Sequence, residues 1–113
     1  MKTLKLALCE SKYVFNVPEL LDGVLFNYTP DITQVCSLES KAELNLLSIL
    51  EHKHIKRNVS IFKGDSFNVC IHLYITGYTS MLISALKVMQ RYGIKIIVYH
   101  FSKRENRFFP QEI

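Results

Sequence analysis

The chain has 113 residues, which is enough for one domain with a real hydrophobic core and too few for a catalytic domain plus a regulatory one. Its formal charge of +4 and pI near 9.0 suit an anionic ligand. Hydrophobic residues make up 49% of the chain and the mean hydropathy is +0.12. We therefore expect apolar surface to be buried against a partner, most simply a second copy in a homodimer.

Polar residues interrupt every apolar run well before the roughly 18 residues that span a bilayer, so no membrane contact is expected. The basic, apolar N-terminus faintly resembles a signal peptide, but Lys5 interrupts it and no small-residue cleavage site follows, which predicts a cytoplasmic protein. Cys9, Cys36 and Cys70 lack metal-ligand spacing and are predicted to be small buried hydrophobes. No metal or cofactor is expected.

Apolar and alternating runs predict strands in chain order, bounded by turn residues. These runs occupy residues 2–9, 13–17, 24–28, 59–62, 67–75, 94–101 and 107–109. The second run either extends the first strand or follows it after a turn. The run at 94–101 is rich in Ile and Val, which predicts a central strand, and the last run is predicted to close a hairpin with Pro110 at its edge.

Two segments have helical periodicity. Ser40 and Glu43 have the spacing of a capping box and predict a helix that ends near His52. Residues 80–92 have a wide apolar face, and Gly93 follows as a left-handed C-terminal cap. The polar stripe of this second helix consists of Ser80, Ser84, Lys87 and Arg91. Strand, helix and strand in this order predict a right-handed parallel crossover.

The turn from Thr76 through Gly77 and Tyr78 to Thr79 and Ser80 joins a buried strand to a helix. Such a turn directs backbone N–H groups and hydroxyls at one spot, which suits a phosphate. Its single glycine matches neither the dinucleotide fingerprint nor the Walker A pattern. The alternative is that Thr79 or Ser80 only caps the helix.

Other polar residues follow strands that are predicted to end at the same edge of the sheet, where ligands collect in open α/β folds. His100, Lys103 and Arg104 could neutralise a phosphate or assist proton transfer, or belong to a solvated basic hairpin. Further candidates are Ser11 and Lys12 after the first strand, and Asn27 and Tyr28, of which Tyr28 could stack on a base or be an ordinary loop residue. His72, within a strand, is predicted to be a satisfied core or interface histidine.

The segment from Cys70 to Ile113, with Ile75-Thr76-Gly77-Tyr78-Thr79 before the helix and Tyr99-His100-Phe101 after it, resembles the CRISPR-associated Rossmann-fold (CARF) family. The resemblance covers about the last 40% of the chain. It implies a dimer that binds cyclic oligoadenylate across a two-fold axis, with Thr76 to Ser80 on ligand phosphates or ribose and Cys9 to Lys12 as a second wall. Some relatives, the ring nucleases, cut this ligand. In this family a Lys or Arg often follows the turn, whereas this chain has Ser80 and Met81 at that place. The difference bears on cleavage of the ligand more than on its binding.

We therefore predict one α/β domain, residues 1–113, with a Rossmann-like, mostly parallel sheet, flanking helices and a C-terminal β-hairpin. The predicted function is binding of a cyclic oligoadenylate of type III CRISPR defence, with cyclic tetra-adenylate favoured. The ligand would be sequestered, or linearised without metal into 2′,3′-cyclic phosphate ends by Thr79, Ser80, Lys103 or Arg104. The alternatives are a basic nucleic-acid-binding module, with long nucleic acid disfavoured because the basic groups are dispersed, and a non-catalytic subunit of a larger complex.

Overall fold

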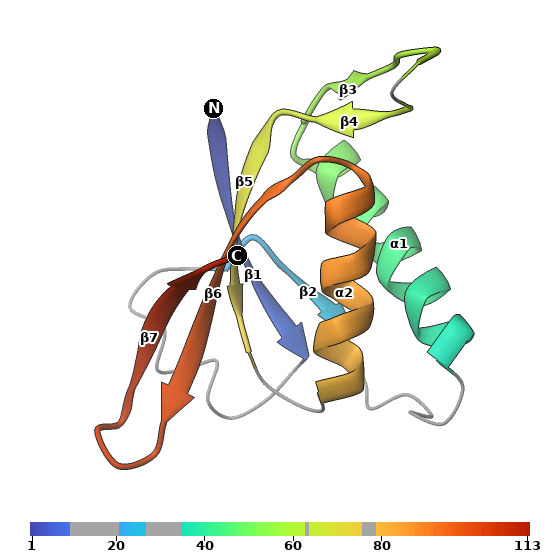
Figure 1. Cartoon of the computed structure of the whole chain (residues 1–113). Coiled ribbons are helices and arrows are strands. Elements are labelled where there is room, and N and C mark those ends of the chain that lie inside the picture. The colour runs from blue at the N-terminus through green and yellow to red at the C-terminus, as the bar shows by residue number, and fades with distance from the viewer. Residues whose placement is uncertain (10–20, 27–34, 63, 76–78) are drawn as a thin grey trace.

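The computed structural model describes residues 1–9, 21–26, 35–62, 64–75 and 79–113, with Val35 and Cys36 described by their backbone alone. A five-stranded sheet in the order β2-β1-β5-β6-β7 forms its centre (Figure 1). These strands are β1 (Lys2–Cys9), β2 (Gly23–Phe26), β5 (Val69–Tyr74), β6 (Lys95–Ser102) and β7 (Arg107–Glu112). All neighbouring pairs are parallel except β6 and β7, which are antiparallel. The predicted mostly parallel α/β architecture with a C-terminal hairpin is confirmed.

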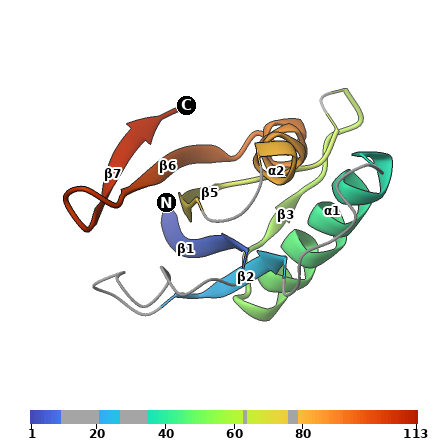
Figure 2. The same cartoon turned by 90° about the horizontal axis from the view of Figure 1, so that it is seen from below.

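Two helices, α1 (Val35–His52) and α2 (Thr79–Arg91), lie on the same face of this sheet (Figure 2). A separate hairpin of β3 (Arg57–Asn58) and β4 (Ser66–Phe67) follows α1. The helices pack against each other, α1 also contacts β2, and α2 contacts β1 and β6. Alternate strand residues face these helices because successive side chains point to opposite faces. The core includes Leu4, Leu6, Leu8, Val69, Ile71, Leu73, Ile96 and Val98 from the strands.

Helix α2 has the predicted apolar face, on which Met81, Ala85, Val88 and Met89 are buried. Gly93 has a φ of +63° and ends the helix as predicted. Its N–H donates to the carbonyl of Gln90 and the N–H of Ile94 donates to the carbonyl of Met89. These two bonds form a Schellman motif and satisfy carbonyls at the end of the helix.

The capping box predicted at Ser40 is wrong, because α1 begins at Val35 and Ser40 lies inside it. A Ser and a Glu three residues apart also occur as neighbours on the surface of a continuing helix, so their spacing alone does not mark a start. Inside α2 the predicted polar stripe is wrong at Ser84, which is 1% exposed. Its Oγ donates to the carbonyl of Ser80 at 2.9 Å, and this internal bond lets the hydroxyl be buried.

The strand predicted at residues 59–62 is also wrong. Pairing of β3 with β4 ends at Asn58, and Ile61 and Phe62 lie in the turn beyond it. Their apolar pattern favours a strand, but the side chains of this segment are not packed against the core, and β propensity depends on that packing. Of the predicted turn that follows, Lys63 lies outside the described residues and Gly64 has a φ of +76°.

Candidate functional site at the carboxyl edge of the sheet

The carboxyl ends of β1, β2, β5 and β6 meet at one edge of the sheet because these strands are parallel (Figure 1). Helix α2 begins at this edge, at Thr79, five residues after β5 ends at Tyr74. The turn between β6 and β7 lies at the same edge. In open α/β sheets this edge is where ligands bind, and the positive end of the α2 dipole points at it.

At the start of α2, Thr79 is exposed and the Oγ of Ser80 is buried. This Oγ has no hydrogen-bond partner among the described residues, so the reading of Ser80 as a helix cap finds no support. A buried hydroxyl without a partner costs roughly 1–3 kcal/mol. The hydroxyl of Ser80 is therefore enclosed by protein atoms at the start of α2, with no partner among the described residues.

His100 lies on β6 at the carboxyl edge, where the sequence placed it. It follows Ile96 and Val98 on the helix-bearing face by alternation, and it is itself exposed. Its Nε2 lies 2.6 Å from the Oε1 of Gln111 on β7, so this nitrogen carries the proton when the two groups share a hydrogen bond. Gln111 was missed by the sequence reasoning, because only the register between β6 and β7 brings it to His100.

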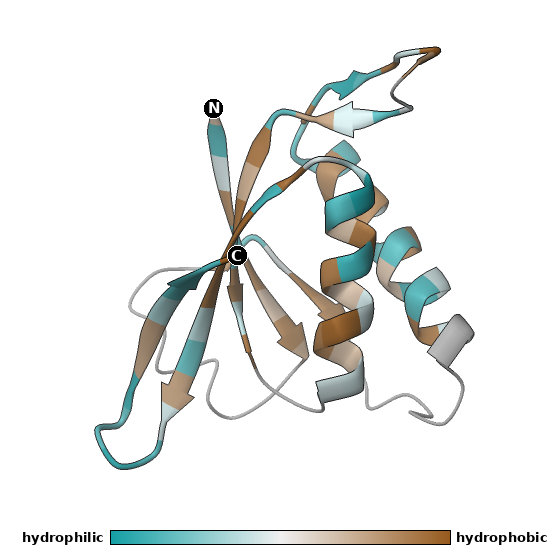
Figure 3. Ribbon diagram, viewed as in Figure 1, coloured by the Kyte–Doolittle hydropathy of each residue, from teal (hydrophilic) through white to brown (hydrophobic). Residues whose placement is uncertain are grey.

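The β6–β7 turn extends the sheet beyond its parallel strands. The last register pair between β5 and β6 joins Tyr74 to Tyr99, so Ser102 lies three residues, or about 10 Å, farther along β6. Lys103 and Arg104 follow in the turn, and both are exposed. Glu105 in the turn pairs with Arg107, the first residue of β7, at 3.3 Å, so the turn itself, residues 103–106, holds two basic residues and one acidic residue. Figure 3 shows this turn as a hydrophilic end of the molecule.

The remaining predicted site residues lie outside the described part of the chain. They are Ser11, Lys12, Asn27, Tyr28, Thr76, Gly77 and Tyr78. The strands that lead into them, which end at Cys9, Phe26 and Tyr74, all end at the carboxyl edge.

His72 is half-buried on the sheet face opposite the helices, and its Nδ1 lies 3.3 Å from the Oη of Tyr99. The prediction of a satisfied histidine is therefore confirmed. Burial, together with the charge of Lys5, lowers the pKa of His72 below its usual value. Burial and the neighbouring Tyr99 raise the pKa of Tyr74. Both pKa shifts arise because the two side chains are wholly or partly buried beside other groups on one face of the sheet.

These residues belong to an aromatic cluster on β5, β6 and β7 that the sequence reasoning missed. Tyr74 and Tyr99 stack with ring centroids 4.6 Å apart, and Tyr74 meets Phe108 edge-on at 5.1 Å. Phe101 also contacts Phe108 at 5.1 Å. The period-two spacing of aromatic residues along β5 and β6 was the available signal, since alternate residues share a face.

A basic segment at residues 53–57, which the nucleic-acid alternative would use together with the β6–β7 turn, lies at the opposite edge of the sheet, where α1 ends. Lys53 pairs with Asp22 at 3.2 Å and Arg57 pairs with Asp65 at 3.2 Å. A cavity of about 270 Å³ lies beside this segment, between α1 and the β3–β4 hairpin. It is therefore at the far end of the molecule from the predicted ligand site.

Cys9 and Cys70 are buried, as predicted, and neither forms a disulfide bond, while the side chain of Cys36 lies outside the described atoms. Among the residues that the structure describes, no group of three His, Cys, Asp or Glu side chains could share a metal ion. In the same part of the chain, neither helix has the length and apolarity needed to cross a membrane. Comparison with protein-family models, with curated proteins and with solved structures finds no match for the chain.

Proposed function

We propose that the protein binds a cyclic oligoadenylate, with cyclic tetra-adenylate favoured, at the carboxyl edge of its sheet. The observation that carries the proposal is the shared position of the start of α2 and the basic β6–β7 turn at this edge. A helix N-terminus and cationic side chains both favour phosphate. Ser80, whose Oγ is buried without a partner among the described residues, is proposed as a further contact to phosphate or ribose.

We further infer that the chain is a Rossmann-like member of the CARF family and works as a cytoplasmic homodimer. The parallel β5–α2–β6 unit supports the first inference, since it is the segment that carries the resemblance. The apolar excess of the chain supports the second.

Linearisation of the bound ring is a second possible outcome of the same site. A ribose 2′-oxygen would attack the adjacent phosphorus, the 5′-oxygen would leave, and the proton of the 2′-hydroxyl would pass to that leaving oxygen. The products are a 2′,3′-cyclic phosphate and a 5′-hydroxyl. The protein would need to hold the 2′-oxygen in line and stabilise phosphate charge, for which Thr79, Ser80, Lys103 and Arg104 are the proposed groups.

Binding of long nucleic acid has less support. Of the basic side chains that this alternative would use, Lys53, Arg57 and Arg107 pair with carboxylates in the described structure. The two basic segments also lie at opposite edges of the sheet, so they do not form one continuous track for a phosphate backbone.

The test incubates the purified chain with cyclic tri-, tetra- and hexa-adenylate and with linear tetra-adenylate as the control. Thermal shift measures binding, and separation of products measures cleavage. We expect cyclic tetra-adenylate to stabilise the protein more than its linear form does. Gly77→Val should abolish this shift and Thr79→Ala should weaken binding about tenfold, provided circular dichroism matches the parent. A well-folded Gly77→Val protein that binds every ring as tightly as the parent would refute the proposed site.

A further inference from the structure

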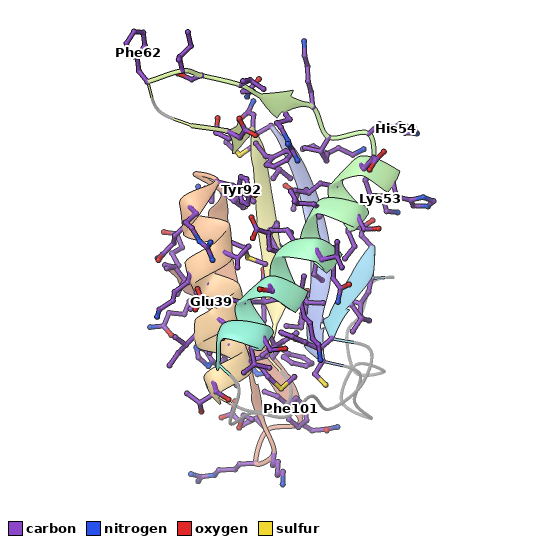
Figure 4. All side chains as sticks on the ribbon, turned by 90° about the vertical axis from the view of Figure 1, so that its right-hand side faces the viewer. Glu39, Lys53, His54, Phe62, Tyr92 and Phe101 are labelled. Carbon is purple, nitrogen blue, oxygen red and sulfur yellow. The ribbon has the colours of Figure 1, made fainter. Side chains whose placement is uncertain are left out.

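The end of the β3–β4 hairpin carries an exposed apolar segment. Val59 is 77% exposed, and Ile61 and Phe62 are each 96% exposed. Figure 4 shows Phe62 at the outer end of the hairpin, away from the helices and the sheet, and Figure 3 shows hydrophobic colour there. Three large apolar side chains within four residues, on a segment that projects from the body, mark an interaction surface.

A cavity with matching chemistry lies at the base of the same hairpin. It has a volume of about 270 Å³ and is lined by Leu47, Glu51, Ile55, Arg57 and Phe67, of which three are apolar. An apolar cavity of about 150 Å³ accepts benzene, so this one has room for a phenyl ring. The guanidinium of Arg57 lies 5.7 Å from the ring centroid of Phe67, and a further ring beside it would gain a cation–π contact.

The Phe62 side chain does not fill the cavity of its own chain. The hairpin pairs through Asn58, and Phe62 lies four residues, or about 13 Å of extended chain, beyond that point. Its side chain is 96% exposed, so none of the residues that the structure describes covers it. The cavity and the apolar segment are therefore complementary surfaces that a single chain leaves apart.

We propose that the β3–β4 hairpin is an arm exchanged between two copies of this chain, with Phe62 of each copy inserted into the cavity between α1 and the hairpin of the other. When the exchange occurs in both directions about a two-fold axis, both Phe62 side chains are buried and both cavities are filled. The assembly therefore closes as a dimer. Residues 59–62 carry no charge, so the insertion buries no charged side chain of the arm.

This contact lies at the amino edge of the sheet, opposite the proposed ligand edge, so it does not rest on the proposed function. A dimer formed at the ligand edge would survive the loss of Phe62. Failure of ligand binding would likewise leave the arm exchange untouched.

The first test places the photoreactive residue p-benzoylphenylalanine at position 62 and irradiates a mixture of ¹⁴N- and ¹⁵N-labelled full-length chains. We expect cross-links between differently labelled chains that map to the peptides around Ile55 and Phe67. Cross-links that map to other surfaces, or an absence of cross-linked dimer, would overturn the proposal.

The second test measures the dimer dissociation constant by sedimentation. Phe62→Ser should weaken the dimer at least tenfold, and Leu44→Ser, which changes a 70% exposed residue on α1, should leave it unchanged. Ile55→Trp should fill the cavity and also weaken the dimer. An equimolar mixture of Phe62→Ser and Ile55→Trp chains should regain part of the affinity, because one intact arm then meets one intact cavity.

A purely structural effect of either variant would not produce this rescue. A monomeric parent at millimolar concentration would overturn the proposal. So would a parent that is monomeric and instead binds anionic phosphatidylserine vesicles through Phe62.

Discussion

Removing the two cations of the β6–β7 turn is the most direct test of the proposed ligand edge. Lys103→Ala with Arg104→Ala removes both basic residues of the turn, residues 103–106, which also holds one acidic residue. A charge-assisted hydrogen bond contributes roughly 1.5–3 kcal/mol, but both side chains are exposed, so solvent screening reduces this to about 1 kcal/mol each. The combined loss of about 2 kcal/mol corresponds to roughly 30-fold weaker binding.

The assay is calorimetric titration with cyclic tetra-adenylate at about 50 mM and at about 300 mM salt. Because salt screens exposed charges, the difference between parent and variant should shrink at the higher concentration. Lys56→Ala with Lys95→Ala is the matched control, since it removes two exposed lysines near the amino edge and gives the same net charge. Affinity that falls equally in both double variants would show a long-range charge effect. Affinity that falls in neither would show that the turn lies outside the site.

Three further predictions concern stability, measured by urea unfolding. Gly93→Ala should lower the free energy of unfolding by about 1 kcal/mol, because the φ of Gly93 is +63°, which strains any residue with a Cβ. The cost stays at that level because the atom nearest to the added Cβ, in Ser66, is 3.8 Å away and causes no clash. An unchanged urea midpoint would contradict this prediction. Leu46→Ala, at a residue 1% exposed, should cost about 2–5 kcal/mol, and a loss below about 1 kcal/mol would show that the site is not core. The pKa of His72 is lowered in the folded state, so its contribution to stability is full above the unfolded pKa near 6.5 and is lost as the pH falls below it. His72→Gln should therefore reduce the loss of stability between pH 7.5 and pH 5.5, and a loss as large as that of the parent would refute the assignment.

The sequence was sufficient to predict an element where the periodicity of its apolar residues and the conformational preference of its end residues agree. Helix α2 has a period of 3.6 in its apolar residues and a glycine at its end, and the structure has that helix and that cap. The runs that form β1, β5 and β6 were also predicted, because continuous or alternating apolar residues are favourable in a buried sheet. The position of His100, Lys103 and Arg104 at the carboxyl edge followed from this order of strand, helix and strand.

Contacts in the tertiary structure determined which of the predicted elements formed and which side chains were buried. Residues 59–62 have the composition of a strand, but no sheet packs against them, and they became the exposed end of a hairpin. Ser84 reads as a surface residue, but a bond to the carbonyl of Ser80 allows its burial. The pairing of His100 with Gln111 and the aromatic cluster around Tyr74 depend on the register between strands. A local pattern reports how one segment folds, whereas strand order, register and burial depend on contacts between residues far apart in the chain, which no single segment encodes.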